Sequence, residues 1–167
     1  KIIEAGTNVI IPKGAAIIDA TGKTIYPSFI DLYSEFGINK PTPRPSGNFT
    51  PQYESSREGY YWNDHIKPEY NAYENLNYDS KAAGNLREAG FGTVLSHHND
   101  GVIAGTGLLW TLNDFGTNAD RMLKEKVSQH FTFSRSKFTK QSYPSSMMGS
   151  MALIRQVFHD AKWYAKG

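Results

Sequence analysis

The stretch that decides the fold is Phe29-Ile30-Asp31-Leu32, taken together with residues 79–96, Asp-Ser-Lys-Ala-Ala-Gly-Asn-Leu-Arg-Glu-Ala-Gly-Phe-Gly-Thr-Val-Leu-Ser. The first is an apolar run of strand type. In the second, Asp-Ser can cap a helix over 81–89 that Gly90 ends, and 91–96 is an apolar strand. A strand, a crossover helix and a second strand predict parallel pairing and an α/β fold.

Short strands and turns are expected before this unit. Three apolar runs, 9–11, 15–19 and 24–26, are separated by Pro, Gly and Thr-Gly turns. A tight hairpin around Gly22 is the simplest interpretation of this pattern.

Strands and one long helix are expected after the unit. Residues 107–112 form a short apolar run, and 127–134 alternate with a period of two, which is typical of a strand. A serine at 145 or 146 can cap a helix running to about Ala165. Apolar residues at helical spacing form one stripe along that helix: Met147, Met151, Ile154, Phe158, Ala161 and Ala165.

The segment 37–78 has a different composition. It contains five prolines and six of the ten tyrosines, Tyr53, Tyr60, Tyr61, Tyr70, Tyr73 and Tyr78. Prolines exclude long regular elements, while so many aromatic residues argue against a disordered linker. We expect a long ordered loop with one helical turn, whose tyrosines either seal it onto the core or line a functional cleft.

Composition narrows the function. The chain has 167 residues, a net charge of +2, no cysteine and 39% hydrophobic residues. This length fits one domain and is too short for a complete (β/α)8 barrel, which needs about 200 residues or more. The absence of a basic run argues against nucleic acid, and the apolar runs are too short for a membrane helix. No targeting segment is visible, so a cytoplasmic and a periplasmic location both remain open.

The first candidate site follows the strand at Phe29. Asp31, Tyr33 and Glu35 would share one face if the strand continues that far, at the end where parallel α/β folds gather functional groups. Two carboxylates and a phenol suit acid–base chemistry. The alternative is that Asp31 accepts hydrogen bonds from neighbouring backbone and Glu35 is solvated.

The second candidate site, His97, His98 and Asp100, follows the strand at 91–96. Adjacent histidines on a strand point to opposite faces, so at most one can share a site with Glu35. A histidine and a carboxylate from neighbouring strand ends could hold a metal, although a complete site needs three or four ligands. Otherwise the histidines bond to loop backbone.

Two other motifs are weak. The glycine-rich run 101–107 lacks the Lys-Ser/Thr of a phosphate-binding loop and better suits a turn between strands. Ser96, His97 and Asp100 do not form a catalytic triad by any sequence criterion, because no Gly-x-Ser-x-Gly elbow is present.

Residues 9–32 carry a resemblance to a known family. Ile-Asp-Ala-Thr-Gly-Lys at 18–23 followed by Pro-Ser-Phe-Ile-Asp at 27–31 resembles the metal-dependent amidohydrolase superfamily, most closely its imidazolonepropionase-like branch. Residues 88–94 and 101–112 resemble later family segments more loosely. In that family the first motif leaves a small β-sandwich and the second opens the barrel. The resemblance therefore implies a partial α/β architecture, with the edge of a β-sandwich over 1–26 and the first strands and helices of a (β/α)8 barrel over 27–167.

The chain departs from the family at its metal site. Where the family has His-x-His directly after this strand, both histidines binding the catalytic metal, this chain has Tyr33-Ser34-Glu35. Tyr33 and Glu35 stand at the two ligand positions, and a phenol of pKa about 10 is a poor zinc ligand. The resemblance assigns no metal role to His97 or His98, so no metal ligand and no cofactor are expected from this segment.

Two functions follow from the resemblance. In the first, the parent protein hydrolyses C–N bonds of non-peptide or cyclic amides in a small-molecule substrate, using water activated by zinc or another divalent metal. In the second, this segment is a degenerate, non-catalytic amidohydrolase-like domain that acts as a scaffold or binding module. Larger bacterial proteins with two amidohydrolase-like halves, the first lacking the ligand pair, fit the resemblance, so enzyme activity is expected for the parent and not for this segment alone. The helix at 146–165 is then expected to pack on the rest of the barrel or on a second chain.

Overall fold

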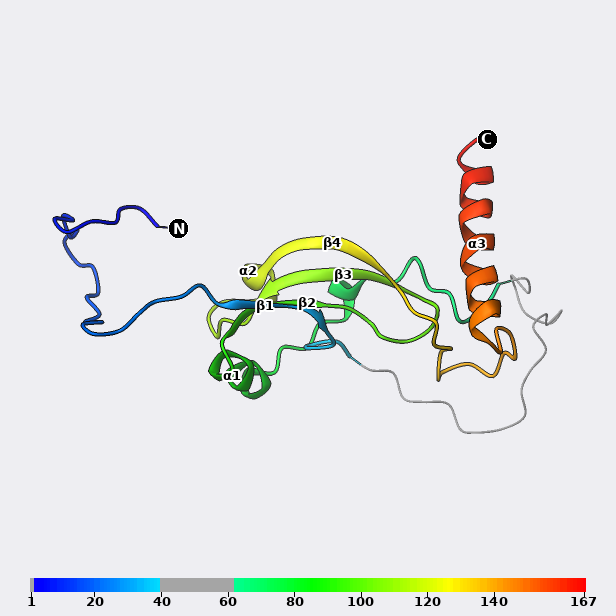
Figure 1. Cartoon of the computed structure of the whole chain (residues 1–167), viewed down its shortest axis with the longest axis horizontal. Coiled ribbons are helices and arrows are strands. Elements are labelled where there is room, and N and C mark those ends of the chain that lie inside the picture. The colour runs from blue at the N-terminus through cyan, green and yellow to red at the C-terminus, as the bar shows by residue number, and fades with distance from the viewer. Residues whose placement is uncertain (1, 40–61) are drawn as a thin grey trace.

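The computed structural model describes residues 2–39 and 62–167, and its centre is a four-stranded sheet (Figure 1). The strands are β1 (Phe29–Ser34), β2 (Phe91–Ser96), β3 (Ile103–Thr111) and β4 (Met122–Phe131), and they lie in chain order. The helices are η1 (Ala72–Asn75, a 3-10 turn), α1 (Ser80–Glu88), α2 (Asn118–Arg121) and α3 (Met147–Tyr164). The predicted α/β class is confirmed.

The first two strands pair in parallel through a crossover that contains α1. Phe29 lies opposite Phe91, and Asp31 lies opposite Val94. The Asp79 carboxylate accepts hydrogen bonds from the backbone N–H groups of Lys81 and Ala82, which caps the helix as predicted. Gly90 follows at a φ of 95°, which glycine adopts without the strain that a Cβ would add.

The remaining pairs are antiparallel. β2 pairs with β3, and β3 pairs with β4, so the sheet is mixed. β3 begins four residues earlier than the apolar run 107–112 indicated, and it takes in most of the glycine-rich segment. The glycine-rich segment therefore forms a turn and part of a strand, which agrees with the expectation that it is not a phosphate-binding loop.

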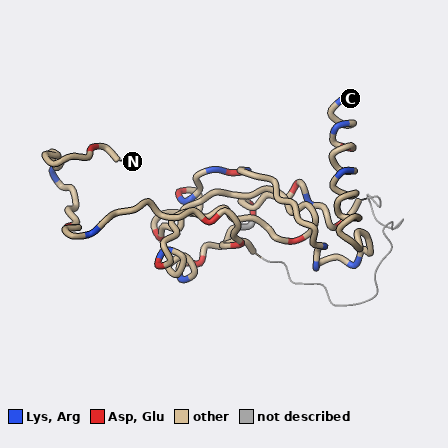
Figure 2. Tube along the Cα trace, viewed as in Figure 1, with Lys and Arg blue, Asp and Glu red and all other residues tan. Residues whose placement is uncertain are grey.

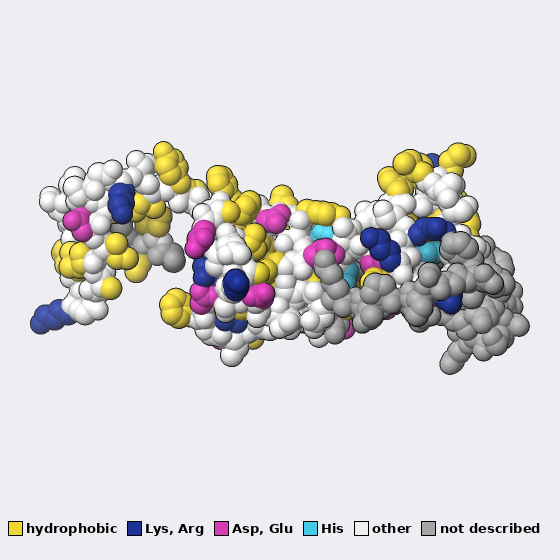
Figure 3. Space-filling model, turned by 90° about the horizontal axis from the view of Figure 1, so that it is seen from below, with side chains coloured by type: hydrophobic (Ala, Val, Ile, Leu, Met, Phe, Trp, Pro, Cys, Tyr) yellow, Lys and Arg dark blue, Asp and Glu magenta, His cyan; other side chains and the backbone are white. Residues whose placement is uncertain are grey.

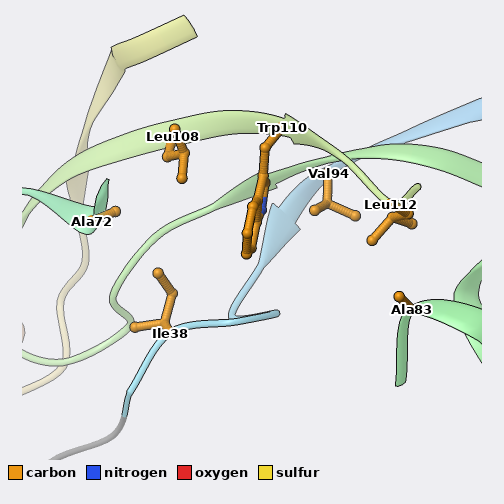
Figure 4. Close-up of a cluster of buried hydrophobic side chains, with 7 residues drawn as sticks. All are labelled: Ile38, Ala72, Ala83, Val94, Leu108, Trp110 and Leu112. Atoms are coloured by element: carbon orange, nitrogen blue, oxygen red, sulfur yellow. The ribbon is translucent and has the colours of Figure 1, made fainter. Parts of the chain in front are cut away.

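One face of the sheet holds the main core, which is centred on Trp110 (Figure 4). Its indole is completely buried and donates a 2.8 Å hydrogen bond to the Ser96 hydroxyl. Phe36 and Tyr78 contact the ring at centroid distances of 5.4 and 5.8 Å. The other buried members come from α1, η1, the neighbouring strands and the residues after β1: Ile38, Ala72, Ala83, Val94, Leu108 and Leu112.

The described part of the tyrosine-rich segment covers this core. Tyr73 and Tyr78 pack against the core cluster, and η1 supplies the one expected helical turn. These two side chains therefore seal the segment onto the core, which was one of the two expectations for them. Tyr53, Tyr60, Tyr61 and the prolines before residue 62 lie outside the described residues.

The hairpin expected around Gly22 is not formed. Residues 2–28 contain turns, including a Lys23 N–H to Ala20 carbonyl bond of 2.9 Å, but no strand, and their isoleucines are exposed. The apolar runs have strand composition, yet no described residue pairs with them, and a strand needs a partner for its backbone groups. Whether residues 1–26 belong to a β-sandwich and 27–167 to a barrel stays a prediction.

The C-terminal helix α3 begins after Ser146, whose hydroxyl accepts a hydrogen bond from the backbone N–H of Gly149, as predicted. It stands away from the sheet (Figure 1). A second apolar cluster attaches it, formed by Leu153 with Ile66, Val102 and Ile103. Much of the apolar stripe expected along this helix is exposed, including Met147, Met151 and Phe158. The apolar residues of the N-terminal segment 2–28 are also exposed (Figure 3).

The period-two pattern at 127–134 predicted a strand, and the strand found there is β4, which begins five residues earlier and ends at Phe131. Val127, Phe131 and Phe133 are exposed, while His130 is partly buried. Acidic and basic residues are mixed along the sheet, whereas the segment between β4 and α3 carries only basic ones, Arg135, Lys137 and Lys140 (Figure 2). Within the described ranges, no helix is both long and apolar enough to span a membrane.

We predict that Trp110→Phe lowers the free energy of unfolding by about 1–3 kcal/mol, because it leaves a gap in the core and removes the donor to Ser96. Trp163→Phe is the matched control: Trp163 is exposed, and its replacement should change stability by less than about 0.5 kcal/mol. Urea denaturation followed by circular dichroism measures both, and equal effects would contradict the central role of Trp110.

Candidate functional site

The end of β1 places the first group of candidate residues. β1 stops at Ser34, so Glu35 lies beyond the strand and the condition for a shared face with Asp31 and Tyr33 is not met. Asp31 accepts a 3.0 Å hydrogen bond from the Tyr33 backbone N–H, as expected for a structural role. Tyr33 is 60% exposed and donates a 2.8 Å hydrogen bond from its hydroxyl to Oδ1 of Asn99.

The side chains of the two adjacent histidines after β2 lie in different environments, as the strand geometry predicted. His97 is 1% exposed and lies edge-on to the Tyr33 ring at a centroid distance of 4.5 Å. His98 lies edge-on to Tyr70 at 4.0 Å. The charge of Glu35 acts on His98 in the direction that raises its pKa, against the larger effects of burial and of Lys67.

A small cavity lies beside His98. It has a volume of about 40 Å³ and is lined by Lys67, Tyr70, His98, Asp100 and Ala104. Burial, followed by the nearby Lys67 charge, lowers the pKa of His98 to about 4, so its imidazole is neutral at pH 7. Nε2 of His98 is buried without a hydrogen-bond partner in the described part of the chain. A cavity of this size has room for a water molecule that could form a hydrogen bond with this nitrogen.

Asp100 links three segments. Its carboxylate accepts a 2.8 Å charged hydrogen bond from Lys67 and further bonds from the Ser136 hydroxyl and the Lys137 backbone N–H. Burial raises the pKa of Asp100, but these bonds outweigh burial and hold the pKa below its usual value. Asp100 therefore fastens residues 136–137 to the loop after β2, and its contacts are structural.

The opposite side of the loop carries a stacked pair of histidines. The rings of His97 and His130 are 3.6 Å apart between centroids, with 9° between their planes. Nδ1 of His97 is 2.7 Å from the His98 carbonyl, which places the proton on Nδ1 of the neutral ring. Nε2 of His130 is 2.8 Å from the Ser128 hydroxyl. Burial, followed by the influence of His97, lowers the pKa of His130 to about 4.

Sequence reasoning missed His130, Lys67 and Gly107. His130 is one polar residue in an alternating strand, and Lys67 lies in an irregular segment, so neither has a local signal. Gly107 does have a local signal, because a glycine inside a strand often marks a place where another part of the chain approaches closely. A Cβ at Gly107 would come within 2.7 Å of His130 Nε2 and 2.9 Å of Leu95.

Tyr33, at one of the two positions where the resembled family has its metal ligands, does not fit a catalytic metal. The Tyr33 hydroxyl donates to Asn99, and a neutral phenol is a poor ligand. Across residues 2–39 and 62–167, no three His, Asp or Glu side chains are placed to hold one ion. The stacked rings of His97 and His130 also do not suit one shared ion, because an imidazole binds a metal in its ring plane. Ser96 bonds to Trp110 and Asp100 to Lys67, so no triad forms with His97.

Comparison with known proteins supports the fold. No family model matches the sequence, and no curated protein matches it. Among solved structures, an amidohydrolase from Thermotoga maritima MSB8 matches 98% of this chain with a TM-score of 0.64 and 23% identity. The chain spans 41% of the length of that protein. The expected partial amidohydrolase-like fold is therefore confirmed as a fold, while the imidazolonepropionase-like branch stays a prediction.

We predict that Asp100→Asn lowers the free energy of unfolding at neutral pH by about 1–3 kcal/mol, because it removes a charge that three donors satisfy. The folded protein holds the pKa of Asp100 below its usual value, so its contribution is present above about pH 4 and is lost as the pH falls further. Urea titrations at several pH values measure this loss in the wild type, and the variant should lack it. Asp160→Asn, at an exposed helical position, is the control, and an equal effect there would contradict the assignment.

Proposed function

We propose that this chain is a non-catalytic scaffold segment of an amidohydrolase-like protein. The observation that carries the proposal is the end of β1, where Tyr33 and Glu35 replace the ligand pair of the family and Tyr33 is instead bonded to Asn99. The fold match to the Thermotoga maritima amidohydrolase over nearly the whole chain supports the relationship.

The parent protein is proposed to hydrolyse the C–N bond of a small amide or cyclic amide. In this proposal, residues outside these 167 bind zinc or another divalent metal and activate the water. The contribution of this chain is the parallel β1–β2 pair, with α1 covering one of its faces. In a (β/α)8 barrel the helices form the outer ring, so the face that carries Tyr33, His97 and His130 would look into the interior.

A competing proposal gives this segment catalytic work of its own through Tyr33, Glu35 or the residues beside them. We predict that Tyr33→Phe and Glu35→Gln, made separately in the whole protein, change kcat/KM for amide hydrolysis by less than about threefold. Both substitutions keep the side-chain size and remove the group that would act in catalysis.

The outcome that supports the competing proposal is a loss of about a hundredfold or more in either variant, with the thermal midpoint unchanged. Metal content is measured alongside activity: in the scaffold proposal, neither variant changes the amount of zinc or other divalent metal that the protein retains. A His-x-His after another Phe-Ile-Asp elsewhere in the protein would mark where the metal binds.

The exposed apolar face of α3 is proposed to pack on the rest of the same protein. Met147, Met151 and Phe158 lie on this face with exposed fractions of 63, 41 and 60%. Single exposed apolar residues are ordinary, but a row of them along one helix is typical of an interface. The matching amidohydrolase is more than twice as long as this chain, which supplies a source for the covering residues.

We predict that Met151→Asp lowers the stability of the whole protein by about 2 kcal/mol or more, because it places a charge in an apolar interface. His159→Asp adds the same charge on the neighbouring, exposed side of α3 and should cost less than about 0.5 kcal/mol. Thermal unfolding of both variants decides the matter, and equal losses would show that the apolar face is not covered.

A further inference from the structure

The stacked histidines join strands that are not neighbours. His97 follows β2, His130 belongs to β4, and β3 lies between them in the sheet. Gly107 of β3 pairs with Ser128 of β4, so the His130 side chain reaches His97 by passing over a residue that has no side chain. Any other residue at this position would place its Cβ where the ring of His130 lies.

The surroundings of the pair favour neutral rings. His97 is almost completely buried, and its Nδ1 proton is directed at the His98 carbonyl. Its Nε2 is buried and has no hydrogen-bond partner among the described residues. The described residues around this nitrogen therefore offer no acceptor for a further donor, and a buried unsatisfied donor is costly.

Among the residues that the structure describes, few titratable groups face the pair. The end of β1 supplies the Tyr33 phenol, the loop after β2 supplies His98 through its carbonyl, β3 supplies Gly107, and β4 supplies the Ser128 hydroxyl. None of these contacts is a carboxylate that would favour a charged imidazole. Two imidazolium rings at a 3.6 Å separation would also repel each other strongly in a poorly solvated site.

β4 connects this pair to the C-terminal helix. It is the edge strand of the sheet and pairs only with β3 in the described structure, with register shifts along the pair. Next to His130, the Phe131 ring stacks on Phe158 of α3 at a centroid distance of 5.9 Å. A change at His130 therefore acts on the strand end that contacts α3.

We propose that the stacked pair of His97 and His130 is a pH-sensitive clasp, which holds the end of β4 to the ends of β1 and β2 while His130 is neutral and releases it when His130 is protonated. Release frees the segment 128–131 from the sheet and loosens its contact with α3. Burial lowers the pKa of His130 to about 4, which agrees with this geometry. Because the unfolded or released state binds the proton more readily, the clasp is fully closed above about pH 6.5 and weakens as the pH falls toward about 4.

The test is amide hydrogen exchange in the whole protein at about pH 7 and about pH 4.5, corrected for the intrinsic pH dependence of exchange. We expect the protection of residues 128–131 to fall by about tenfold or more between these two conditions, while the protection of β2 is retained. His130→Phe keeps a ring for stacking but cannot be protonated, and it should remove most of this dependence. His98→Gln is the matched control, because the pKa of His98 is also lowered to about 4 although His98 lies outside the stack; that variant should keep the dependence.

Unchanged protection of 128–131 in the wild type, or an equal pH dependence in His130→Phe, overturns the proposal. Should His130→Phe fail to fold, imidazole titration of the wild type by NMR decides instead. The proposal requires that the His130 signal titrate well below pH 6.5 and that the Phe131 amide shift with it; an ordinary His130 pKa overturns it. The clasp does not depend on the proposed scaffold function, since exchange is read without any activity measurement.

Discussion

The burial of Trp110 is the interaction on which the rest of the described structure depends. Its indole lies against the face of the sheet where α1, η1 and the residues after β1 converge, and all of them touch the same cluster. The Ser96 hydroxyl accepts the indole N–H, so the one polar atom of the ring is satisfied inside the core. The position of Ser96 then fixes where β2 ends, and with it the positions of His97 and His98 on either side of the next loop.

This arrangement makes one face of the sheet apolar and the other polar. The face covered by α1 is apolar and closed, whereas the opposite face carries Tyr33, His97 and His130. The polar face lies at the strand ends, where active sites of parallel α/β folds are found. Its side chains contact one another instead: His97 and His130 stack, and Tyr33 bonds to the Asn99 amide. Strand ends that gather polar groups can therefore be used for holding strands together, and position alone does not define catalysis.

The local parts of the fold could be predicted from the sequence because their signals are local. The Asp79 cap, Gly90 and the strand at 91–96 are each encoded within a few residues, and the same is true of the cap at Ser146. The missing hairpin at Gly22 shows the limit of local signals, since strand composition cannot supply a pairing partner.

Contacts between distant segments had no such local signal. His130 reaches His97 only because Gly107 leaves the space between them, and Lys67 meets Asp100 from an irregular segment. The antiparallel direction of β3 and β4 also depended on pairing, which alternation of residue types does not specify. The presence of Tyr33 and Glu35 where the resembled family has its histidine pair was visible in the sequence, whereas the bond from Tyr33 to Asn99 required the structure.

The parallel pairing of β1 with β2 has a consequence for the order of folding. Phe29 lies opposite Phe91, so about 60 residues of chain must close before this pair forms, whereas β2, β3 and β4 follow one another through short connections. Closing the long loop costs entropy that the neighbouring hairpins do not have to overcome. The antiparallel part of the sheet and α1 should therefore assemble first, and β1 should dock last, onto an edge that the rest of the sheet has already built.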